Sequence, residues 1–309
     1  MQTYKYNLQK KKKYLIVIVG PTAIGKTSLS IELAQLFKCE ILSADSRQFF
    51  KEISIGTAKV TPEEALGVPH HFVGHISISE EYNAGKFERD ALAKLEELFQ
   101  QQNIAILAGG SGLYVDAVCN GIDDIPKDNL IREQLQKELE EKGIEALQEE
   151  LKEKDIEHYQ QMNLLNPQRL IRALEVCRIS GKTYTSFRTN SKKKRPFEII
   201  RIGLTAPREM IYENINKRVH IMMEHGLLEE VKSVEQYKHL NSLNTVGYKE
   251  LFAHLQGEWK LETAIEEIQK NTRRFAKRQL TWFNRDEQTK WFDISKKDEI
   301  ADYIKSLIH

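Results

Sequence analysis

The sequence predicts an α/β protein with a P-loop-type core, in which a mostly parallel sheet is flanked by helices and interrupted by an all-helical insertion domain. Three observations carry this prediction. Apolar runs of β type alternate with helical patterns over the first third of the chain, and a glycine-rich loop joins the first such pair. A long, charged helical stretch without a strand candidate then separates two β-type runs.

The glycine-rich loop has the sequence GPTAIGKT, and it lies between the apolar run Tyr14–Val19 and a helical pattern at Lys26–Phe37. This spacing in a strand–loop–helix context is typical of a phosphate-binding loop. Its glycines let successive backbone N–H groups point inward, and the helix N-terminus adds a partial positive charge. We expect Lys26 to reach the terminal phosphates and the Thr27 hydroxyl to bind Mg²⁺. The residues expected to bind a di- or triphosphate are Gly20, Pro21, Thr22, Ala23, Ile24, Gly25, Lys26 and Thr27.

The next part of the chain continues the alternation of strands and helices. The β-type runs span residues 40–46, 70–78 and 103–108, and a helical pattern spans residues 83–101. Such alternation predicts a mostly parallel sheet, whose ligands bind beyond the carboxyl ends of the strands. We therefore expect the phosphate loop, the pair Asp45-Ser46 and the glycine-rich loop at residues 109–112 to line one cleft.

The domain organisation follows from a change in pattern near Pro126. Residues 127–181 are helical and strongly charged, with no strand candidate. A basic linker at residues 192–196 leads into a returning β-type run at residues 197–204, after which the chain reads as mainly helical from Pro207 onward. The predicted core comprises residues 1–125 and 196–309, and the predicted insertion domain comprises residues 126–195.

Charge and composition restrict the cellular setting. The net charge of +1 gives no global basic field, so any contact with nucleic acid has to be local. The cysteines Cys39, Cys119 and Cys177 are far apart and share no metal-ligand spacing, which indicates a reducing compartment. The run Lys10–Lys13 is interpreted as a solvated tail in preference to a nucleic-acid arm. With no apolar segment of signal or membrane length, we expect a cytoplasmic protein without membrane contact, and nothing requires more than a monomer.

Asp45 is the candidate acid–base residue, because it stands where a strand meets the phosphate cleft. A general base facing the partner of the phosphate ester is one interpretation, and helix capping or a second-layer role at Mg²⁺ is the other. An ATP-hydrolysing enzyme normally offers a carboxylate on a later strand to hold Mg²⁺. The run that ends Leu107-Ala108 offers none. This departure argues against an ordinary ATPase.

The last long helical pattern combines an apolar stripe with a basic face. Phe275 falls on the stripe, which we expect to be buried, and Gln279 also points into it, where it must reach a backbone group or a base. Lys277 and Arg278 lie away from the stripe. Basic side chains beside Trp282 suit phosphate contact and base stacking, so this face favours RNA binding slightly over plain solvation.

Several independent stretches together resemble the bacterial tRNA dimethylallyltransferase family, also called tRNA isopentenyltransferase. They span the chain from about Gly20 to Phe283, in the order of the family. A helix that starts at Asn166 as N-cap, with Pro167 in its first turn, carries one of them. The stretches are GPTAIGKT, SADSRQ, IGTAK, GGSGLY, NPQRLIRALE, TVGYK and AKRQLTWF.

The resemblance implies transfer of a dimethylallyl group from dimethylallyl diphosphate to the exocyclic amine of the adenosine immediately 3′ of the anticodon, giving N6-isopentenyladenosine and diphosphate. The phosphate loop would then hold a diphosphate leaving group with Mg²⁺. Asp45 would accept the proton of the amine or a hydrogen bond from it, and Lys26, Thr27 and Arg218 would stabilise the charge that grows on diphosphate. The adenosine would leave its stack to enter the cleft.

The resemblance also implies the contacts with the tRNA anticodon stem-loop, which the helical insertion would grip from one side. Two departures from the family pattern stand out: Ser111 occupies a position where threonine is usual, and Asn214 one where arginine is common. The implied tRNA-contacting residues are Asp45, Ser46, Arg47, Gln48, Ser111, Arg132, Gln168, Arg169, Leu170, Ile171, Arg172, Asn244, Thr245, Val246, Gly247, Tyr248, Lys249, Lys277, Arg278, Gln279, Leu280, Thr281, Trp282, Phe283 and Asn284. Ser111 is also counted with the catalytic group.

Three alternatives remain. An adenylate isopentenyltransferase would use the same chemistry on a free nucleotide, without need of the insertion or the carboxy-terminal contacts. A P-loop small-molecule kinase would need a phosphoryl acceptor and usually an arginine-bearing lid. A non-catalytic RNA-binding protein would have no need to retain Lys26, Thr27 and Asp45 together.

Overall fold

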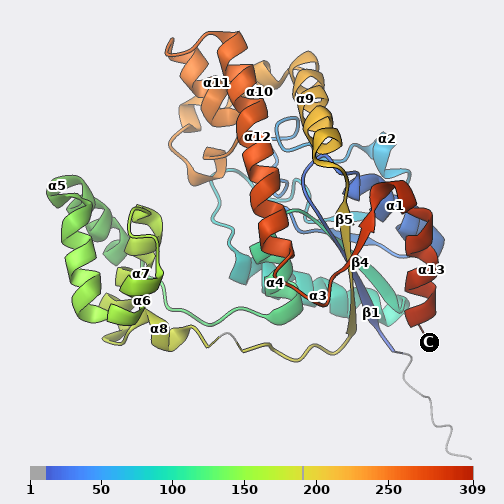
Figure 1. Cartoon of the computed structure of the whole chain (residues 1–309), viewed down its shortest axis with the longest axis horizontal. Helices are drawn as coiled ribbons and strands as arrows, with labels where there is room; N and C mark the ends of the chain where they lie inside the picture. The colour runs from blue at the N-terminus through green and yellow to red at the C-terminus, as the bar shows by residue number, and fades with distance from the viewer. Residues whose placement is uncertain (1–11, 190, 309) are drawn as a thin grey trace, which may run out of the picture. The chain divides into compact units, whose positions relative to one another are not determined.

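The computed structural model describes residues 12–189 and 191–308, so the run Lys10–Lys13 lies partly outside the described residues. The chain forms two compact units (Figure 1). Unit 1 contains the chain up to Cys119 and from Arg195 onward, and unit 2 contains residues 120–194. The predicted boundaries, after residues 125 and 195, lie close to these.

A six-stranded sheet is the centre of unit 1, with strand order β3-β2-β4-β1-β5-β6. Every pairing in it is parallel. All residues of β1 are buried, as expected of a central parallel strand covered on both faces. The strands are β1 Tyr14–Val19, β2 Ile41–Ser43, β3 His70–His71, β4 Ile104–Ala108, β5 Glu198–Thr205 and β6 Lys290–Asp293.

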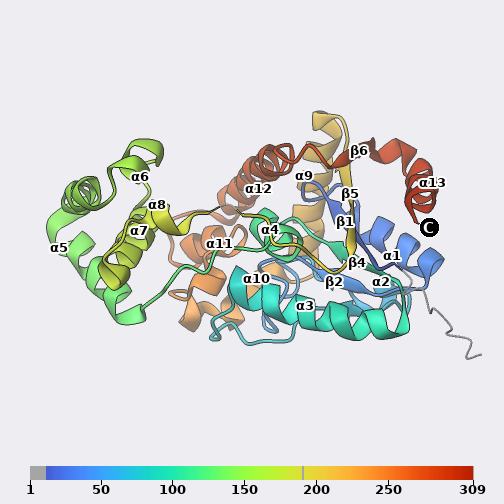
Figure 2. The same ribbon diagram turned by 90° about the horizontal axis from the view of Figure 1, so that it is seen from below.

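Helices cover both faces of this sheet (Figures 1 and 2). Leu15 and Val17 of β1 pack into a core that α3 and α4 complete, while Ile16 and Ile18 pack into a second core with α1 and α13. This alternation is the two-residue period of a strand buried on both sides. The helices of unit 1 are α1 Lys26–Phe37, α2 Pro62–Ala65, α3 Ala84–Gln101, α4 Gly112–Asn120, α9 Arg208–Glu224, α10 Leu227–Ser233, α11 Tyr248–Leu255, α12 Leu261–Phe283 and α13 Asp298–Leu307, with 3-10 turns η1 Glu235–Tyr237, η2 Asn241–Leu243 and η3 Ile294–Lys296.

Unit 2 is all-helical over its described residues, as predicted. Its core contains Leu147, Leu151 and Leu174. Asn166 caps α7 by accepting the N–H of Arg169 at 3.2 Å, and Pro167 opens the helix. The helices are α5 Asn129–Lys154, α6 Ile156–Gln161, α7 Pro167–Ser180 and α8 Tyr184–Phe187.

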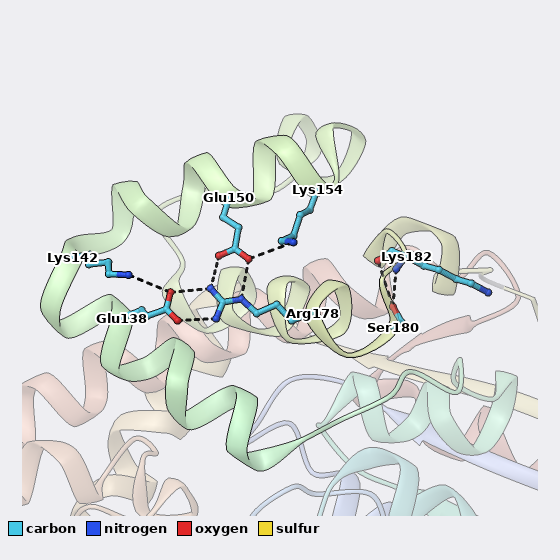
Figure 3. Close-up of polar contacts among 7 residues, drawn as sticks. All are labelled: Glu138, Lys142, Glu150, Lys154, Arg178, Ser180 and Lys182. Atoms are coloured by element: carbon cyan, nitrogen blue, oxygen red, sulfur yellow. Dashed lines mark hydrogen bonds and ion pairs between the residues drawn. The ribbon is translucent and has the colours of Figure 1, made fainter.

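Ion pairs of one arginine with two glutamates connect α7 to both halves of α5. Helix α5 is kinked at Gly143 (φ 80°). The guanidinium of Arg178 donates to Glu138 at 2.8 and 2.9 Å and to Glu150 at 2.9 and 2.5 Å (Figure 3). Hydrogen bonding to the two carboxylates raises the pKa of Arg178 above its ordinary value. A bidentate guanidinium therefore fixes the angle between the segments on either side of the kink.

Two sequence-based expectations about strands were incomplete. Residues 290–293 form the edge strand β6, although the chain after Pro207 was predicted to be mainly helical. The apolar stretch 70–78 contributes only two strand residues, because the N–H groups of Gly74 and Ile76 bond instead to carbonyls of Gln48 and Phe49.

Candidate functional site

The phosphate loop has the backbone conformation that its glycines predict. Gly25 caps α1 with a φ of 100°, in the left-handed region, and Gly20 lies so close to β5 that a Cβ would be 2.8 Å from the carbonyl oxygen of Leu204. The Nζ of Lys26 folds back onto the loop and donates to the carbonyl oxygens of Gly20 at 3.0 Å and Pro21 at 2.8 Å. The ammonium is therefore held at the loop that a phosphate group would occupy.

The electrostatics of Lys26 suit an anion site. Burial and the positive charge of Arg218 together lower the pKa of Lys26 to about 7, against the opposing effect of Asp45. Arg218 comes from α9, and its Nη1 lies 3.4 Å from the Thr22 hydroxyl. Burial likewise lowers the pKa of Arg218. Two desolvated cations thus lie at one loop, where a bound anion would compensate both of them.

Gln279 of α12 joins the phosphate loop to the loop after β4. Its Oε1 accepts the N–H of Thr22 at 2.8 Å, and its Nε2 donates to the carbonyl oxygen of Gly110 at 2.9 Å. Gly110 leaves the room for this contact, because a Cβ there would be 2.2 Å from Nε2. Of the two partners that the sequence allowed for Gln279, a backbone group or a base, the structure shows backbone groups.

Asp45 follows β2 and lies in a tight turn. Its Oδ1 accepts the N–H of Arg47 at 2.9 Å. The N–H of Ser46 donates to the hydroxyl of Ser111 at 2.9 Å. The N–H of Ser111 in turn donates to the carbonyl oxygen of Ala44 at 3.2 Å. The loops after β2 and β4 are therefore fixed to each other, and the second oxygen of Asp45 has no part in this turn.

Two cavities adjoin at this turn. The first, of about 510 Å³, is lined by the phosphate loop, by Gly109 and by Asp45, whereas Ser46 and Ser111, expected in the same cleft, line the second. The second, of about 530 Å³, is lined by Asp45 and by Arg47, Lys249 and Arg278. The residues that line both cavities are Thr22, Asp45, Thr57, Ala58, Arg218 and Phe275.

The second cavity has more basic than acidic side chains in its lining. Burial lowers the pKa of Arg47, whose Nη2 lies 3.4 Å from the carbonyl oxygen of Asn244. Thr245 and Gly247 of the same loop also line this cavity. A half-buried guanidinium with one long hydrogen bond to protein is well suited to an incoming anionic ligand.

Comparison with known proteins identifies the family. A family model described as IPP transferase matches residues 48–286. The chain belongs to the IPP transferase family. The family match begins at Gln48 and includes all of α12, and it therefore contains part of the walls of both cavities.

Relatives within the family are similar over almost their entire length. The tRNA dimethylallyltransferase of Christiangramia forsetii is 55% identical over 298 residues, which cover 96% of this chain and 99% of the relative. That of Flavobacterium johnsoniae is 55% identical over 300 residues, covering 94% of this chain and 97% of the relative. The tRNA dimethylallyltransferase 1 of Phocaeicola vulgatus is 51% identical over 296 residues, covering 96% of this chain and 99% of the relative.

Solved structures of transferases that carry tRNA in their names have the same fold. The full-length tRNA isopentenylpyrophosphate transferase of Bacillus halodurans has a TM-score of 0.71 at 36% identity, covering 96% of this chain and 97% of that chain. A eukaryotic dimethylallyltransferase acting on tRNA has a TM-score of 0.74 at 27% identity, covering 91% of this chain and 74% of that chain. This IPP transferase therefore shares its fold with both of these solved structures.

Several residues implied as tRNA contacts have side chains in the protein cores. Leu170 and Ile171 are fully buried in unit 2, Tyr248 is fully buried in unit 1, and Phe283 packs in the core beside it. These side chains point into the protein interior in this structure, so any contact of their motifs with tRNA would have to come from neighbouring residues or from the backbone. Phe275 departs in the opposite sense: it is 38% exposed, although the apolar stripe predicted its burial.

Arg172 and Trp282 are engaged within the protein. Arg172 donates to the carbonyls of Pro126 at 2.9 Å and Ile125 at 3.1 Å, and it pairs with the buried Glu175 at 2.8 Å. The Nε1 of Trp282 donates to Asp116 at 2.9 Å, and the guanidinium of Arg285 lies 3.9 Å from the centre of its ring. Base stacking on Trp282 would therefore have to use the ring face away from Arg285.

Of the other implied contacts, Gly247 and Gln279 are also buried, whereas several charged and polar side chains are accessible. On unit 2, Arg132, Gln168 and Arg169 are exposed, and on unit 1, Lys277 and Arg278 are exposed. Asn214, the departure noted from the sequence, donates to the carbonyl of Ala23 in the phosphate loop at 3.3 Å. None of the helices within residues 12–189 and 191–308 has the length and apolarity of a membrane span.

Proposed function

We propose that this IPP transferase moves a dimethylallyl group from dimethylallyl diphosphate to the exocyclic amine of the adenosine 3′ of the anticodon in tRNA. The observation that carries the proposal is the position of Asp45, whose side chain lines both the cavity with the phosphate loop and the second cavity beside it. Donor and acceptor in the two cavities would meet at this carboxylate.

On the donor side, the phosphate loop binds the diphosphate. Its N–H groups and the N-terminus of α1 favour an anion, and Lys26 moves from the carbonyls of Gly20 and Pro21 to the phosphate oxygens. Negative charge grows on diphosphate as the bond between oxygen and the allylic carbon breaks. Lys26 and Arg218 are placed to stabilise that charge, and a low-dielectric site strengthens the effect.

Mg²⁺ fits the donor cavity by the chemistry of its oxygen donors. The exposed Thr27 hydroxyl and Asp45 line this cavity, and the described residues contain no group of three or more His, Cys, Asp or Glu side chains that could hold a metal by themselves. A Mg²⁺ ion held by Thr27 and Asp45 would take its other ligands from phosphate and water. When bound, the ion neutralises charge on the diphosphate.

On the acceptor side, the adenosine leaves its stack and enters the second cavity. Ser46 and Arg47, which line this cavity, hold the extruded nucleotide, with Arg47 directed at a neighbouring phosphate, and Gln48 supports them from the side of the donor cavity. The amine nitrogen forms a bond to the allylic carbon, the carbon–oxygen bond breaks, and diphosphate leaves. The proton of the amine passes to Asp45, whose turn hydrogen bond from Arg47 uses one carboxylate oxygen only.

The exposed Arg132, Gln168 and Arg169 of unit 2 bind the anticodon stem-loop through its phosphates. A cytoplasmic location and a monomeric state complete the proposal and stay predictions. In this scheme Ser111 acts through Ser46, whose N–H it accepts, and so keeps the Asp45 turn in place.

The deciding experiment incubates the protein with Mg²⁺, labelled dimethylallyl diphosphate and unmodified tRNA, and analyses the digested nucleosides. We expect label in N6-isopentenyladenosine. Parallel reactions replace the tRNA with free adenosine monophosphate, or the donor with ATP labelled in its terminal phosphate. Label in the free nucleotide would favour the adenylate transferase, and transfer of phosphate with unmodified tRNA would favour the kinase.

A further inference from the structure

A carboxylate outside both cavities joins their walls. Glu230 of α10 accepts the N–H groups of Ser54 at 2.7 Å and Ile55 at 2.8 Å through Oε2. Its Oε1 accepts the N–H of Gly56 at 2.9 Å and the hydroxyl of Tyr248 at 2.6 Å. With four donors, this carboxylate accepts about as many hydrogen bonds as its two oxygens allow.

On the donor side, Glu230 sets the course of the loop at residues 54–58. Three successive N–H groups point at the carboxylate, an arrangement that backbone nests use for anions. The loop then presents Thr57 and Ala58 to both cavities. The Nε2 of Gln48 donates to the carbonyls of Thr57 and Ala58, each at 3.1 Å, so this wall also positions a residue of the Asp45 turn.

On the acceptor side, Glu230 holds Tyr248. The ring of Tyr248 is fully buried and packs so closely on Gly56 that a Cβ there would be 2.6 Å from the phenol. Burial, and then the carboxylate of Glu230, raise the pKa of the Tyr248 phenol, which therefore stays a donor. Gly247 and Lys249, the residues directly before and after Tyr248, line the second cavity.

We propose that Glu230 is a positioning residue, which sets the separation of the loop at residues 54–58 from the loop at residues 244–249 and thereby aligns the acceptor amine with the allylic carbon at Asp45. The inference rests on the proposed function. Glu230 contacts neither substrate in this scheme. Its effect falls on the rate of the transfer step, because reaction rates respond steeply to displacements of about 1 Å between reacting groups.

The test compares Glu230→Gln with Glu229→Gln. The glutamine at residue 230 keeps the size of the side chain but turns an NH₂ group toward backbone donors, so the loop has to shift. Glu229 is the matched control: it is the preceding residue of α10, its side chain is 70% exposed, and its ion pair with Lys232 is long, at 3.9 Å. Each variant is assayed for kcat with saturating substrates, for Kd with inorganic diphosphate and for Kd with tRNA.

We expect Glu230→Gln to lower kcat about tenfold to hundredfold, with both Kd values within about twofold of wild type, and Glu229→Gln to change none of them. The folded fraction is taken from the diphosphate-binding stoichiometry. A kcat equal to that of wild type would overturn the inference, and so would a fall in kcat that a lower folded fraction or weaker binding accounts for in full.

Tyr248→Phe provides a second variant if Glu230→Gln does not fold. It removes one donor and leaves the ring against Gly56, so we expect a smaller fall in kcat, of about threefold to tenfold, again without a change in Kd. The double variant should be no slower than Glu230→Gln alone, and additive losses would contradict the shared role. A wild-type protein that forms no isopentenyladenosine would instead refute the proposed function itself.

Discussion

The Nε2 of Gln279 donates to the carbonyl oxygen of Gly110 at 2.9 Å, and it does so from a position in the chain 169 residues away. The other end of the same amide accepts the N–H of Thr22. One side chain of α12 therefore satisfies a group in the phosphate loop and a group in the loop after β4. Helix α12 is in this way part of the wall around the phosphate loop, in addition to the role in RNA binding that its basic face suggested.

Replacing Gln279 by leucine should both destabilise the protein and weaken donor binding. The variant leaves the N–H of Thr22 and the carbonyl of Gly110 unpaired, and each buried unpaired group costs about 1–3 kcal/mol. Denaturant unfolding and titration with inorganic diphosphate measure the two effects. Gln269→Leu, on the same helix with a surface contact to His220, is the control and should leave both unchanged. An unaltered diphosphate Kd in Gln279→Leu would separate α12 from the donor site.

Asp45→Asn should lower turnover at least ~100-fold, because the amide cannot take the proton of the amine. The asparagine keeps an oxygen that can accept the N–H of Arg47, so the turn is retained. Single-turnover rates at saturating donor and tRNA isolate the chemical step. If Asp45→Asn turned over at the wild-type rate, the proton would have to leave by another route.

Lys26→Met should abolish transfer and yet raise stability, with a gain that depends on pH. The folded pKa of Lys26, about 7, lies below the ordinary value of a lysine, so between these values the unfolded chain binds more protons than the folded one. The stability of the wild type therefore rises with pH across this window. The advantage of Lys26→Met should be largest below pH 7 and shrink as the pH rises toward 10. Melting temperatures against pH measure it.

Lys232→Met serves as the control for that series, because the Lys232 side chain is about half-exposed and its ion pair is with Glu229 of α10. Its difference from wild type should show no comparable trend with pH. A Lys26→Met advantage that stayed constant with pH would mean that the ammonium is already well hydrated in the folded protein.

Local motifs of the sequence predicted a large part of this molecule. The phosphate loop and the Asn166 cap depend on residues that are close in sequence, and each was found where it was expected. The parallel sheet followed from the alternation of strand and helix patterns, each of them local, although β1 pairs with strands that are distant in sequence. The edge strand β6 was missed because four residues at the margin of a sheet carry too short a pattern.

Other features depend on partners that are distant in sequence. The contact of Glu230 with the loop at residues 54–56 joins residues more than 170 positions apart, and no local pattern announces it. The prediction counted every residue of a motif as an RNA contact. It therefore included residues such as Leu170 and Tyr248, whose side chains are buried. Which residues of a motif are exposed depends on how its helix packs. The order of residues in a motif does not by itself show which helix face is buried.

The basic face of α12 should bind the tRNA backbone. Replacing Lys277 and Arg278 with alanine removes two exposed charges, so the tRNA Kd should rise and the slope of log K against log salt should fall by about two. Binding of inorganic diphosphate should not change. Alanine at Lys296 and Lys305, which are exposed and line neither cavity, is the matched control. An unchanged salt slope would mean that Lys277 and Arg278 contact solvent only.

Phe275 should matter for the donor far more than for folding. It is the one large apolar side chain among the residues that line both cavities, and it is 38% exposed, whereas Phe283 of the same helix is buried. Alanine at Phe275 should therefore cost less than about 1 kcal/mol of unfolding free energy, against about 3–5 kcal/mol for alanine at Phe283. The allylic group loses an apolar surface, so we expect a KM for dimethylallyl diphosphate raised several-fold with Phe275→Ala. Inorganic diphosphate, which has no allylic group, should bind this variant as it binds the wild type, and equal losses for both ligands would place Phe275 at the phosphates instead.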